Sequence, residues 1–358
     1  MNTNNSKRHT LKLMLGGAVA GSLMALGIPE ALAQNGSSAE AAGYTGADRQ
    51  QRLVAGAKKE GSLMVYSSMP VHDMGVLTAA FEKKYGVKVQ VWRASSESVL
   101  QRAVAEARAN RFAVDIIETN GPEMESLHRE KLLQAVKSPY LADIIPQALR
   151  PHGEWVGTRL NIFTQAYNTN VIKKDELPKT YQDLLNPRWK GKLGIEASDL
   201  DWFAGVVTEL GEAKGLQLFR DIVATNGISV RKGHTLLDNL VVSGEVPLAL
   251  TVYNYKVEQY KRKGAPIDWF AIPPAMARPN GEGMLKHAPH PNAAVLFFDF
   301  MLSDGQALLL KRDFITTNKK YHSPLMNMPL SFLDPTVTLD QNEKWRKLYQ
   351  QIITDQSK

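Results

Sequence analysis

Short apolar segments alternate with longer amphipathic segments through the first third of the chain. Residues 63–66 are apolar, as in a buried strand, and the next apolar side chains recur at helical spacing until Gly86. Residues 87–92 and 114–117 repeat the strand pattern, and each is followed by a helical one. Parallel strands need a crossover connection, which is usually a helix, so this alternation predicts a mostly parallel sheet covered by helices.

The alternation is interrupted at residues 155–168, where strand-like periodicity continues without a long helix. A second series follows, with strands predicted over 192–196, 228–231 and 246–252 and a helix over 293–302. We interpret residues 155–168 as a segment that crosses from one α/β unit to another. In such sheets a ligand lies beyond the carboxyl ends of the strands, so the loops after the strands are the candidate site.

The N-terminus has the order of a secretion signal. Residues 6–12 are basic, residues 13–26 form a short apolar run, and small residues precede a predicted cleavage between Ala33 and Gln34. A membrane anchor needs roughly 20 apolar residues, which is longer than this run. The Lys-Arg pair in the basic head resembles a twin-arginine signal with lysine in place of the first arginine. We therefore expect export to a periplasm.

The composition restricts the chemistry and the partners. The chain has no cysteine, which excludes disulfides, thiolate metal sites and a lipoprotein anchor. Its formal charge of +7 falls to +5 without residues 1–33, and its basic residues are scattered rather than interleaved with aromatic ones. We expect a free monomer with no nucleic-acid partner, whose basic balance favours anionic ligands.

Several stretches, in order along nearly the whole mature chain, resemble the family-1 extracellular solute-binding proteins, and especially their ferric-iron-binding branch. No single stretch carries the resemblance; the series does. The stretches are residues 63–68, 81–89, 155–157, 167–170, 177–184, 186–195, 264–266 and 286–294.

This resemblance implies a type II periplasmic-binding fold, in which two α/β lobes close on a ligand that is passed to an inner-membrane ABC permease. It implies a discontinuous first lobe over residues 47–160 and 283–358, and a second lobe over 161–282. The polar residues 34–46 would precede the lobes as a mobile leader. No cofactor is expected.

The chain departs from the iron-binding branch at the positions of its metal ligands. A histidine commonly follows the first strand in that branch, where this chain has Pro70, with His72 two residues away. The branch also has adjacent tyrosines late in the second lobe, whereas Tyr253 and Tyr255 are separated by Asn254. These departures favour a small organic anion as ligand. Ferric iron is the second choice, with the two tyrosines as its ligands, and a polyamine or thiamine-like cation is the third.

The candidate site residues of the first lobe follow its predicted strands. Serine pairs stand at two helix starts, where hydroxyl and free N–H groups bind anions, although the same serines can simply cap their helices. Arg93 could hold a carboxylate with its planar guanidinium or form a surface ion pair. The candidates in this lobe are Ser67, Ser68, Arg93, Ser95, Ser96 and Asn120.

In the second lobe and the crossing segment, the candidates are again at strand ends. Strand alternation places Tyr253 and Tyr255 on the same side, and core packing is the alternative for one of them. Trp202 could cover an organic ligand, whereas Asp199 is a ligand or a helix cap. The candidates are Tyr167, Ser198, Asp199, Trp202, Tyr253, Asn254 and Tyr255.

Enzyme motifs are absent from the sequence. There is no Gly-x-Ser-x-Gly, no His-Glu-x-x-His, no phosphate-binding glycine loop and no cysteine cluster, which argues against a secreted hydrolase or metalloenzyme. His287 and His290 have metal-ligand spacing, but they lie between prolines in a predicted surface turn. The sequence thus predicts ligand capture by lobe closure, and a periplasmic sensor partner with the same fold is the alternative.

Overall fold

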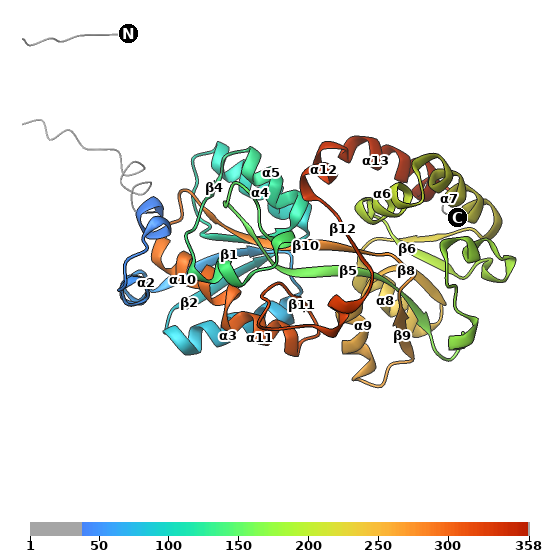
Figure 1. Cartoon of the computed structure of the whole chain (residues 1–358), viewed down its shortest axis with the longest axis horizontal. Helices are drawn as coiled ribbons and strands as arrows, with labels where there is room; N and C mark the ends of the chain where they lie inside the picture. Colours follow the sequence, from blue (N-terminus) through green and yellow to red (C-terminus); the bar gives the residue numbers. More distant parts are fainter. Residues whose placement is uncertain (1–37, 357–358) are drawn as a thin grey trace, which may run out of the picture.

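Two α/β lobes lie side by side and are joined by two long crossing strands, β5 (Val156–Asn168) and β10 (Ala275–Leu285), in the computed structural model, which describes residues 38–356 (Figure 1). β5 and β10 are antiparallel to each other. The first part of β5 pairs with β10, whereas residues 163–168 pair with strands of the second lobe. The predicted boundary at residues 160 and 161 therefore falls inside one continuous strand.

The first lobe has the parallel arrangement that the alternation predicts. β1 (Ser62–Ser67) lies between β2 (Lys88–Arg93) and β3 (Ile116–Asn120) and is parallel to both. The crossover helices are α3 (Val71–Tyr85) and α4 (Ser96–Arg108). The third strand ends at residue 120, later than predicted, because its polar end pairs with the antiparallel strand β10.

Helices on the outer side complete the first lobe. α10 (Pro291–Leu302) is buried along its whole length and packs against α2 (Arg49–Glu60), where Arg49 forms a buried ion pair with Asp299. The lobe also contains α5 (Gly121–Arg129), β4 (Leu133–Gln134), α11 (Asp304–Lys311) and β11 (Ile315–Thr316). Within residues 38–356 no single helix has the length and apolarity to span a membrane, although α10 and α11 together, bent by 52°, meet those two criteria.

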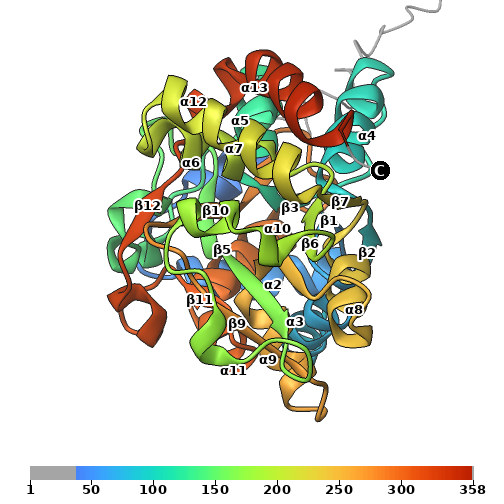
Figure 2. The ribbon, with the colours of Figure 1, turned by 90° about the vertical axis from the view of Figure 1, so that its right-hand side faces the viewer.

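The second lobe has a smaller sheet between two helical layers. β6 (Leu193–Glu196) is parallel to β7 (Ser229–Arg231) and β8 (Leu248–Tyr253), and β8 and β9 (Ile267–Phe270) are antiparallel to β5. Seen end-on, helices lie on both sides of this sheet (Figure 2). The upper pair is α6 (Leu200–Glu209) and α7 (Glu212–Asn226); the lower pair is α8 (His234–Ser243) and α9 (Asn254–Lys261).

The C-terminal segment passes from the first lobe to the second. After β12 (Leu330–Phe332), α12 (Pro335–Asp340) packs against α5, but α13 (Asn342–Tyr349) packs against α6. The ring of Tyr349 lies 5.4 Å from that of Phe203. The expected assignment of all residues 283–358 to the first lobe is therefore wrong for α13, whose apolar face is covered by the second lobe. The turn Gln350–Thr354 follows it.

Short 3-10 helices connect the main elements: Pro139–Asp143, Pro146–Ala148, Lys174–Glu176, Tyr181–Leu185, Pro187–Trp189 and Pro324–Asn327. The expected mobile leader is partly structured, because residues 38–43 are helical, Ala42 is fully buried and its carbonyl accepts the Lys137 N–H. The predicted signal, including Ala33 and Gln34, lies outside the described residues.

Candidate functional site

Polar side chains gather where the crossing strands pass between the lobes. Arg159 and Asn161 on β5 stand opposite Asn280 and Arg278 on β10, and all four residues are buried. Polar groups inside a buried strand require partners, and their partners come from both lobes. We call this region, together with the side chains that contact it, the junction.

The first lobe supplies a carboxylate to the junction. Glu118, near the end of β3, forms a buried ion pair with Arg159 and accepts a 2.6 Å hydrogen bond from the Ser67 hydroxyl. Thr119 donates to the Ser68 hydroxyl at 3.0 Å. The side chains of the candidates Ser67 and Ser68, at the end of β1, are thus bonded to the end of β3.

The second lobe supplies a matching ion pair. Arg278 is paired with Asp201 of α6 at 2.5 Å, and its other terminal nitrogen donates to the Tyr253 hydroxyl at 2.7 Å. The guanidinium also lies 5.1 Å from the centre of the Phe163 ring. Both junction arginines are therefore neutralised by carboxylates of the protein.

Tyr253 and Tyr255 lie face to face beside these ion pairs. Their rings are 5.9 Å apart and within 10° of parallel, and Tyr255 stacks on Phe314 at 4.0 Å. Burial raises the pKa of both phenols, although Arg278 opposes the rise at Tyr253 and Arg159 opposes it at Tyr255. Two phenol groups are thus held in the second lobe, out of solvent.

Glu123, in the first turn of α5, brings an unpaired carboxyl group to the same region. Its Oε2 atom is buried without a hydrogen-bond partner. Burial raises its pKa to about 7, and Arg278 opposes that rise. This carboxyl oxygen could therefore accept a bond from a ligand.

Arg93 and the serines at the start of α4 do not join the junction. Arg93 is exposed and donates to the backbone oxygens of Ser68 and Met69 at 3.3 and 3.4 Å. Ser95 caps α4 by accepting the Ser98 N–H at 3.2 Å, and Ser96 is the first residue of that helix. These groups bond to the local backbone, and the anion site expected from them stays a prediction.

Two further candidates have different positions. The Asn120 side-chain oxygen accepts a 2.7 Å hydrogen bond from Asn280, which places it in the junction. Tyr167 is buried farther along β5 with its ring 6.0 Å from Phe270, within the second lobe.

Asn254 connects the lobes, because its side-chain amide donates to the backbone oxygen of Asp313 at 3.3 Å. Ser198 is exposed, and its backbone N–H donates to the Glu196 carboxylate at 2.5 Å.

Trp202 lies in the core and not over a ligand. It has no exposed surface, and its ring is 6.0 Å from Tyr181 and 5.7 Å from Phe219. Trp202 belongs to the apolar side of α6, and this side packs into the core of the second lobe. Asp199, at the cap position of α6, makes no capping bond and instead pairs with His234 at 3.0 Å.

The sequence matches the family described as bacterial extracellular solute-binding proteins over residues 73–308. This match covers well over half of the chain. The chain belongs to this family. The two crossing strands and the two α/β lobes are those of a type II periplasmic-binding fold, which confirms the expected fold class.

Three similar proteins illustrate the range of this family. Iron uptake protein A1 of Synechocystis sp. is 26% identical over 273 residues, covering 72% of this chain and 75% of that protein. Iron-bound HitA from Pseudomonas aeruginosa has a TM-score of 0.71 at 22% identity, covering 81% and 99% of the two chains. AfuA from Actinobacillus pleuropneumoniae, a periplasmic binding protein with exogenous fructose-6-phosphate bound, has a TM-score of 0.71 at 23% identity, covering 82% and 99%.

Membership of a family of extracellular solute-binding proteins confirms that this protein is a binding protein and not an enzyme. Residues that sequence reasoning missed nevertheless dominate the junction. They are Glu118, Glu123, Arg159, Asp201, His234 and Arg278. One sequence signal could have revealed some of them. Charged residues lie inside the two crossing strands, which are expected to be buried, and a buried charge needs a partner.

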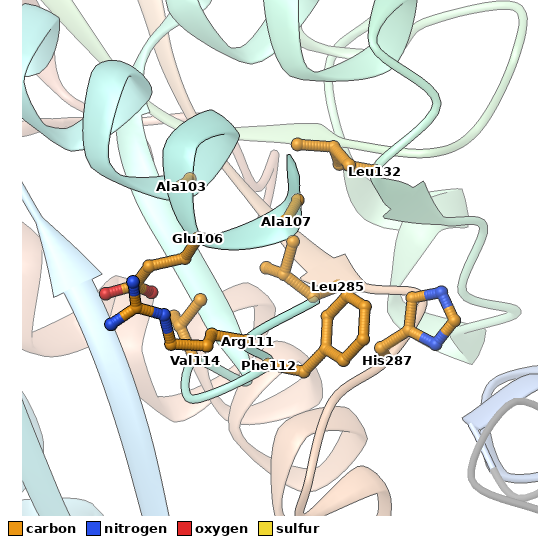
Figure 3. A pocket seen from close by; sticks show the side chains of 9 residues that line it. All are labelled: Ala103, Glu106, Ala107, Arg111, Phe112, Val114, Leu132, Leu285 and His287. Carbon is orange, nitrogen blue, oxygen red and sulfur yellow. The ribbon is translucent and has the colours of Figure 1, made fainter. Parts of the chain in front are cut away.

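A shallow hollow on the first lobe lies outside the junction (Figure 3). Figure 3 shows Phe112 beside His287, and the two rings are stacked at 4.2 Å. His290, by contrast, pairs with Asp115 at 2.9 Å. The two histidines therefore have separate partners and do not form a metal pair.

Asp238 of α8 is a buried acid whose ionisation should affect stability. It has no exposed surface and neither carboxyl oxygen has a hydrogen-bond partner, and burial raises its pKa from 3.8 to about 7. A raised carboxyl pKa favours folding while the group is protonated, so this contribution is lost as the pH rises from about 4 to about 7.

The Asp238→Asn variant cannot ionise, so its unfolding free energy relative to the parent should increase between pH 5 and pH 8. Urea unfolding in metal-free buffer at both pH values measures this difference. Asp221→Asn, at an exposed position on α7, is the control and should leave the difference unchanged. Parallel pH profiles for the parent and Asp238→Asn would contradict the prediction.

Proposed function

We propose that this solute-binding protein captures ferric iron at the junction in the periplasm and delivers it to an inner-membrane ABC importer. The observation that carries this proposal is the buried pair Tyr253 and Tyr255, whose parallel rings lie 5.9 Å apart beside the crossing strands. Ferric iron is a hard, strongly acidic cation and is well suited to phenolate and carboxylate oxygens. The relatives named for iron uptake or bound iron support the same ligand.

The charge balance of the junction supports a cation over an organic anion. Arg159 is paired with Glu118, and Arg278 is paired with Asp201. Besides these pairs, the junction holds the carboxyl of Glu123 and two phenols, all of which become anionic on losing a proton. A cation would compensate these charges, whereas a further anion would add to them.

Metal binding would reverse the protonation of the two phenols. In the metal-free protein burial raises the pKa of Tyr253 and Tyr255, so both are neutral. A bound trivalent cation favours the phenolate form, and its charge outweighs the effect of burial. The Arg278 donor at 2.7 Å from the Tyr253 oxygen would also stabilise a phenolate there.

An organic anion, which was the first choice from the sequence alone, is the second candidate. The observation in its favour is that the Nε atoms of Arg159 and Arg278 are buried without hydrogen-bond partners. A phosphate or carboxylate could accept from them. AfuA, with fructose-6-phosphate bound, shows that this fold accommodates a sugar phosphate in another protein.

Addition of ferric citrate to the metal-free protein tests the proposal. We expect a visible tyrosinate-to-iron charge-transfer band that saturates with iron, and a rise in melting temperature because the ligand binds only the folded state. Citrate alone and fructose-6-phosphate are the controls. A colourless protein whose melting temperature rises with either organic anion alone would reverse the order of the two candidates.

The junction also suits ligand capture by lobe closure, as expected for a binding protein that acts as a monomer. Contacts between the lobes flank the site: Gln259 of α9 donates to Asp73 of α3 at 3.1 Å, and Arg262 pairs with Asp313. A sensor partner would use the same closure. Adjacent permease and ATPase genes would favour import over sensing.

A further inference from the structure

The second lobe has a group of potential metal ligands that the proposed iron site does not use. Glu196 ends β6, Asp199 precedes α6, and His234 begins α8. One ligand atom from each residue lies within 4.8 Å of the other two. We call these three residues the acid-imidazole cluster.

The Glu196 carboxylate is held rigidly by the backbone. It accepts the N–H of Ser198 at 2.5 Å and the N–H of Gly233 at 2.9 Å, one on each oxygen. The backbone N–H of Glu196 donates in turn to the Thr251 hydroxyl at 3.1 Å. Each carboxylate oxygen has a second lone pair, so these bonds orient the group without exhausting its capacity as a ligand.

Asp199 and His234 complete the cluster in fixed positions. The Asp199 Oδ2 atom lies 3.0 Å from His234 Nε2, a separation that two ligands of one metal ion can have. The imidazole stacks on the Tyr253 ring at 4.3 Å and 26°, which restricts its rotation. Asp199 is 3% exposed, so it is largely shielded from water.

Negative charge in the cluster is only partly compensated. Within residues 38–356 no lysine or arginine forms an ion pair with Glu196 or Asp199, and His234 is the sole partner of Asp199. Asp238, one turn along α8 from His234, adds a third buried carboxyl without a hydrogen-bond partner. A cation at this position would relieve the repulsion.

We infer that Glu196, Asp199 and His234 bind a divalent first-row transition ion, with zinc as the representative species, at a second site beside the proposed iron site. Two carboxylate oxygens and one imidazole nitrogen suit zinc, which often takes three protein ligands and a water. The backbone donors to Glu196 supply the outer-shell support that metal sites require. This inference does not rest on iron being the transported ligand.

The other cluster with potential metal ligands lacks suitable geometry. His128 and His152 stack face to face at 3.7 Å and 12°, so their nitrogen lone pairs lie in parallel planes and do not converge on one ion. His152 Nδ1 also accepts the Glu154 N–H at 3.1 Å, and its Nε2 lies 3.4 Å from a carboxylate oxygen of Glu125. We use this cluster as a control site.

Titration calorimetry of the untagged, metal-free protein with Zn²⁺ tests the inference. We expect one binding step in the parent. His234→Ala and Asp199→Asn should each weaken it more than about 100-fold, since loss of an outer-shell partner alone costs about 10- to 100-fold. His290→Ala should retain it, because His290 and Asp115 form the same kind of hydrogen bond without a third ligand. His152→Ala should also retain it.

Two further measurements keep the outcome interpretable. Thermal unfolding without metal shows whether each variant is folded, and Asp199→Asn provides a second reading if His234→Ala is not. The absorption of bound Co²⁺ should change when His234 is removed. Zinc affinity unchanged in both cluster variants, or lost in His152→Ala, would overturn the inference.

The double variant of Tyr253 and Tyr255 to phenylalanine should lose the iron band but still bind zinc, so failure at one site is distinguishable from failure at the other.

Discussion

Replacing Tyr253 and Tyr255 together with phenylalanine is expected to abolish the ferric charge-transfer band and the thermal stabilisation by ferric citrate. The substitution removes both phenolate ligands but keeps the rings that stack on His234 and Phe314. The fold should lose about 1.5–3 kcal/mol, because the buried, charged Arg278 loses its hydrogen bond to Tyr253. Visible spectra and melting curves with and without ferric citrate measure the two effects.

Tyr181→Phe is the matched control for this experiment. Tyr181 is also a buried tyrosine of the second lobe, but its ring lies in the core beside Trp202 and Phe219. This variant should keep the colour of the iron-loaded parent. A double variant that still develops the band would contradict the proposed ligands. If an organic anion is the ligand, each phenylalanine should cost only about 0.5–3 kcal/mol of binding and no band should form in any protein.

Trp202→Ala is expected to lower the unfolding free energy by about 3–5 kcal/mol, because it leaves a large cavity in a closely packed region. Trp202 is fully buried and contacts Tyr181 and Phe219 with its ring. Urea unfolding measures the loss. At a temperature where the variant is folded, its ligand affinity should equal that of the parent, since the indole does not face the junction.

Trp92→Ala is the control for the effect of indole removal. Trp92 is only partly buried on the edge strand β2, where it contacts Tyr66 and Arg102. Trp92→Ala should lower the unfolding free energy less than Trp202→Ala does, because water can enter the space that the indole leaves at the edge of the sheet. Equal stabilities of Trp202→Ala and the parent, combined with lost ligand affinity, would restore the ligand-covering role that the sequence suggested.

The elements of the first lobe could be predicted because they depend on local patterns. The apolar run before residue 67 and the helical spacing after it determine β1 and α3, and Gly86 ends the helix with φ of 72°. The continuous strand periodicity of residues 155–168 likewise indicated β5. The family resemblance then supplied the arrangement of the lobes, which local periodicity cannot supply.

The anion site expected at the start of α4 stays a prediction, and the junction is built from contacts between residues that are distant in the sequence. Ser95 and Arg93 satisfy nearby backbone groups, and a sequence does not distinguish such a residue from one that faces a ligand. The charged residues inside β5 and β10 were the better signal, because burial of Arg159 and Arg278 favours pairing with an opposite charge.

The sequence by itself therefore determined the alternation of strands and helices, the crossing strand, and the family to which the chain belongs. Only the tertiary structure decided which polar groups are paired and which remain available. Glu118 meets Arg159 across 41 positions of the chain, and Asp201 meets Arg278 across 77. These pairings leave Glu123 and the tyrosine pair available to a ligand. Such choices depend on the closure of two lobes around shared strands, and long-range electrostatic pairing has no periodicity along the chain that would reveal it.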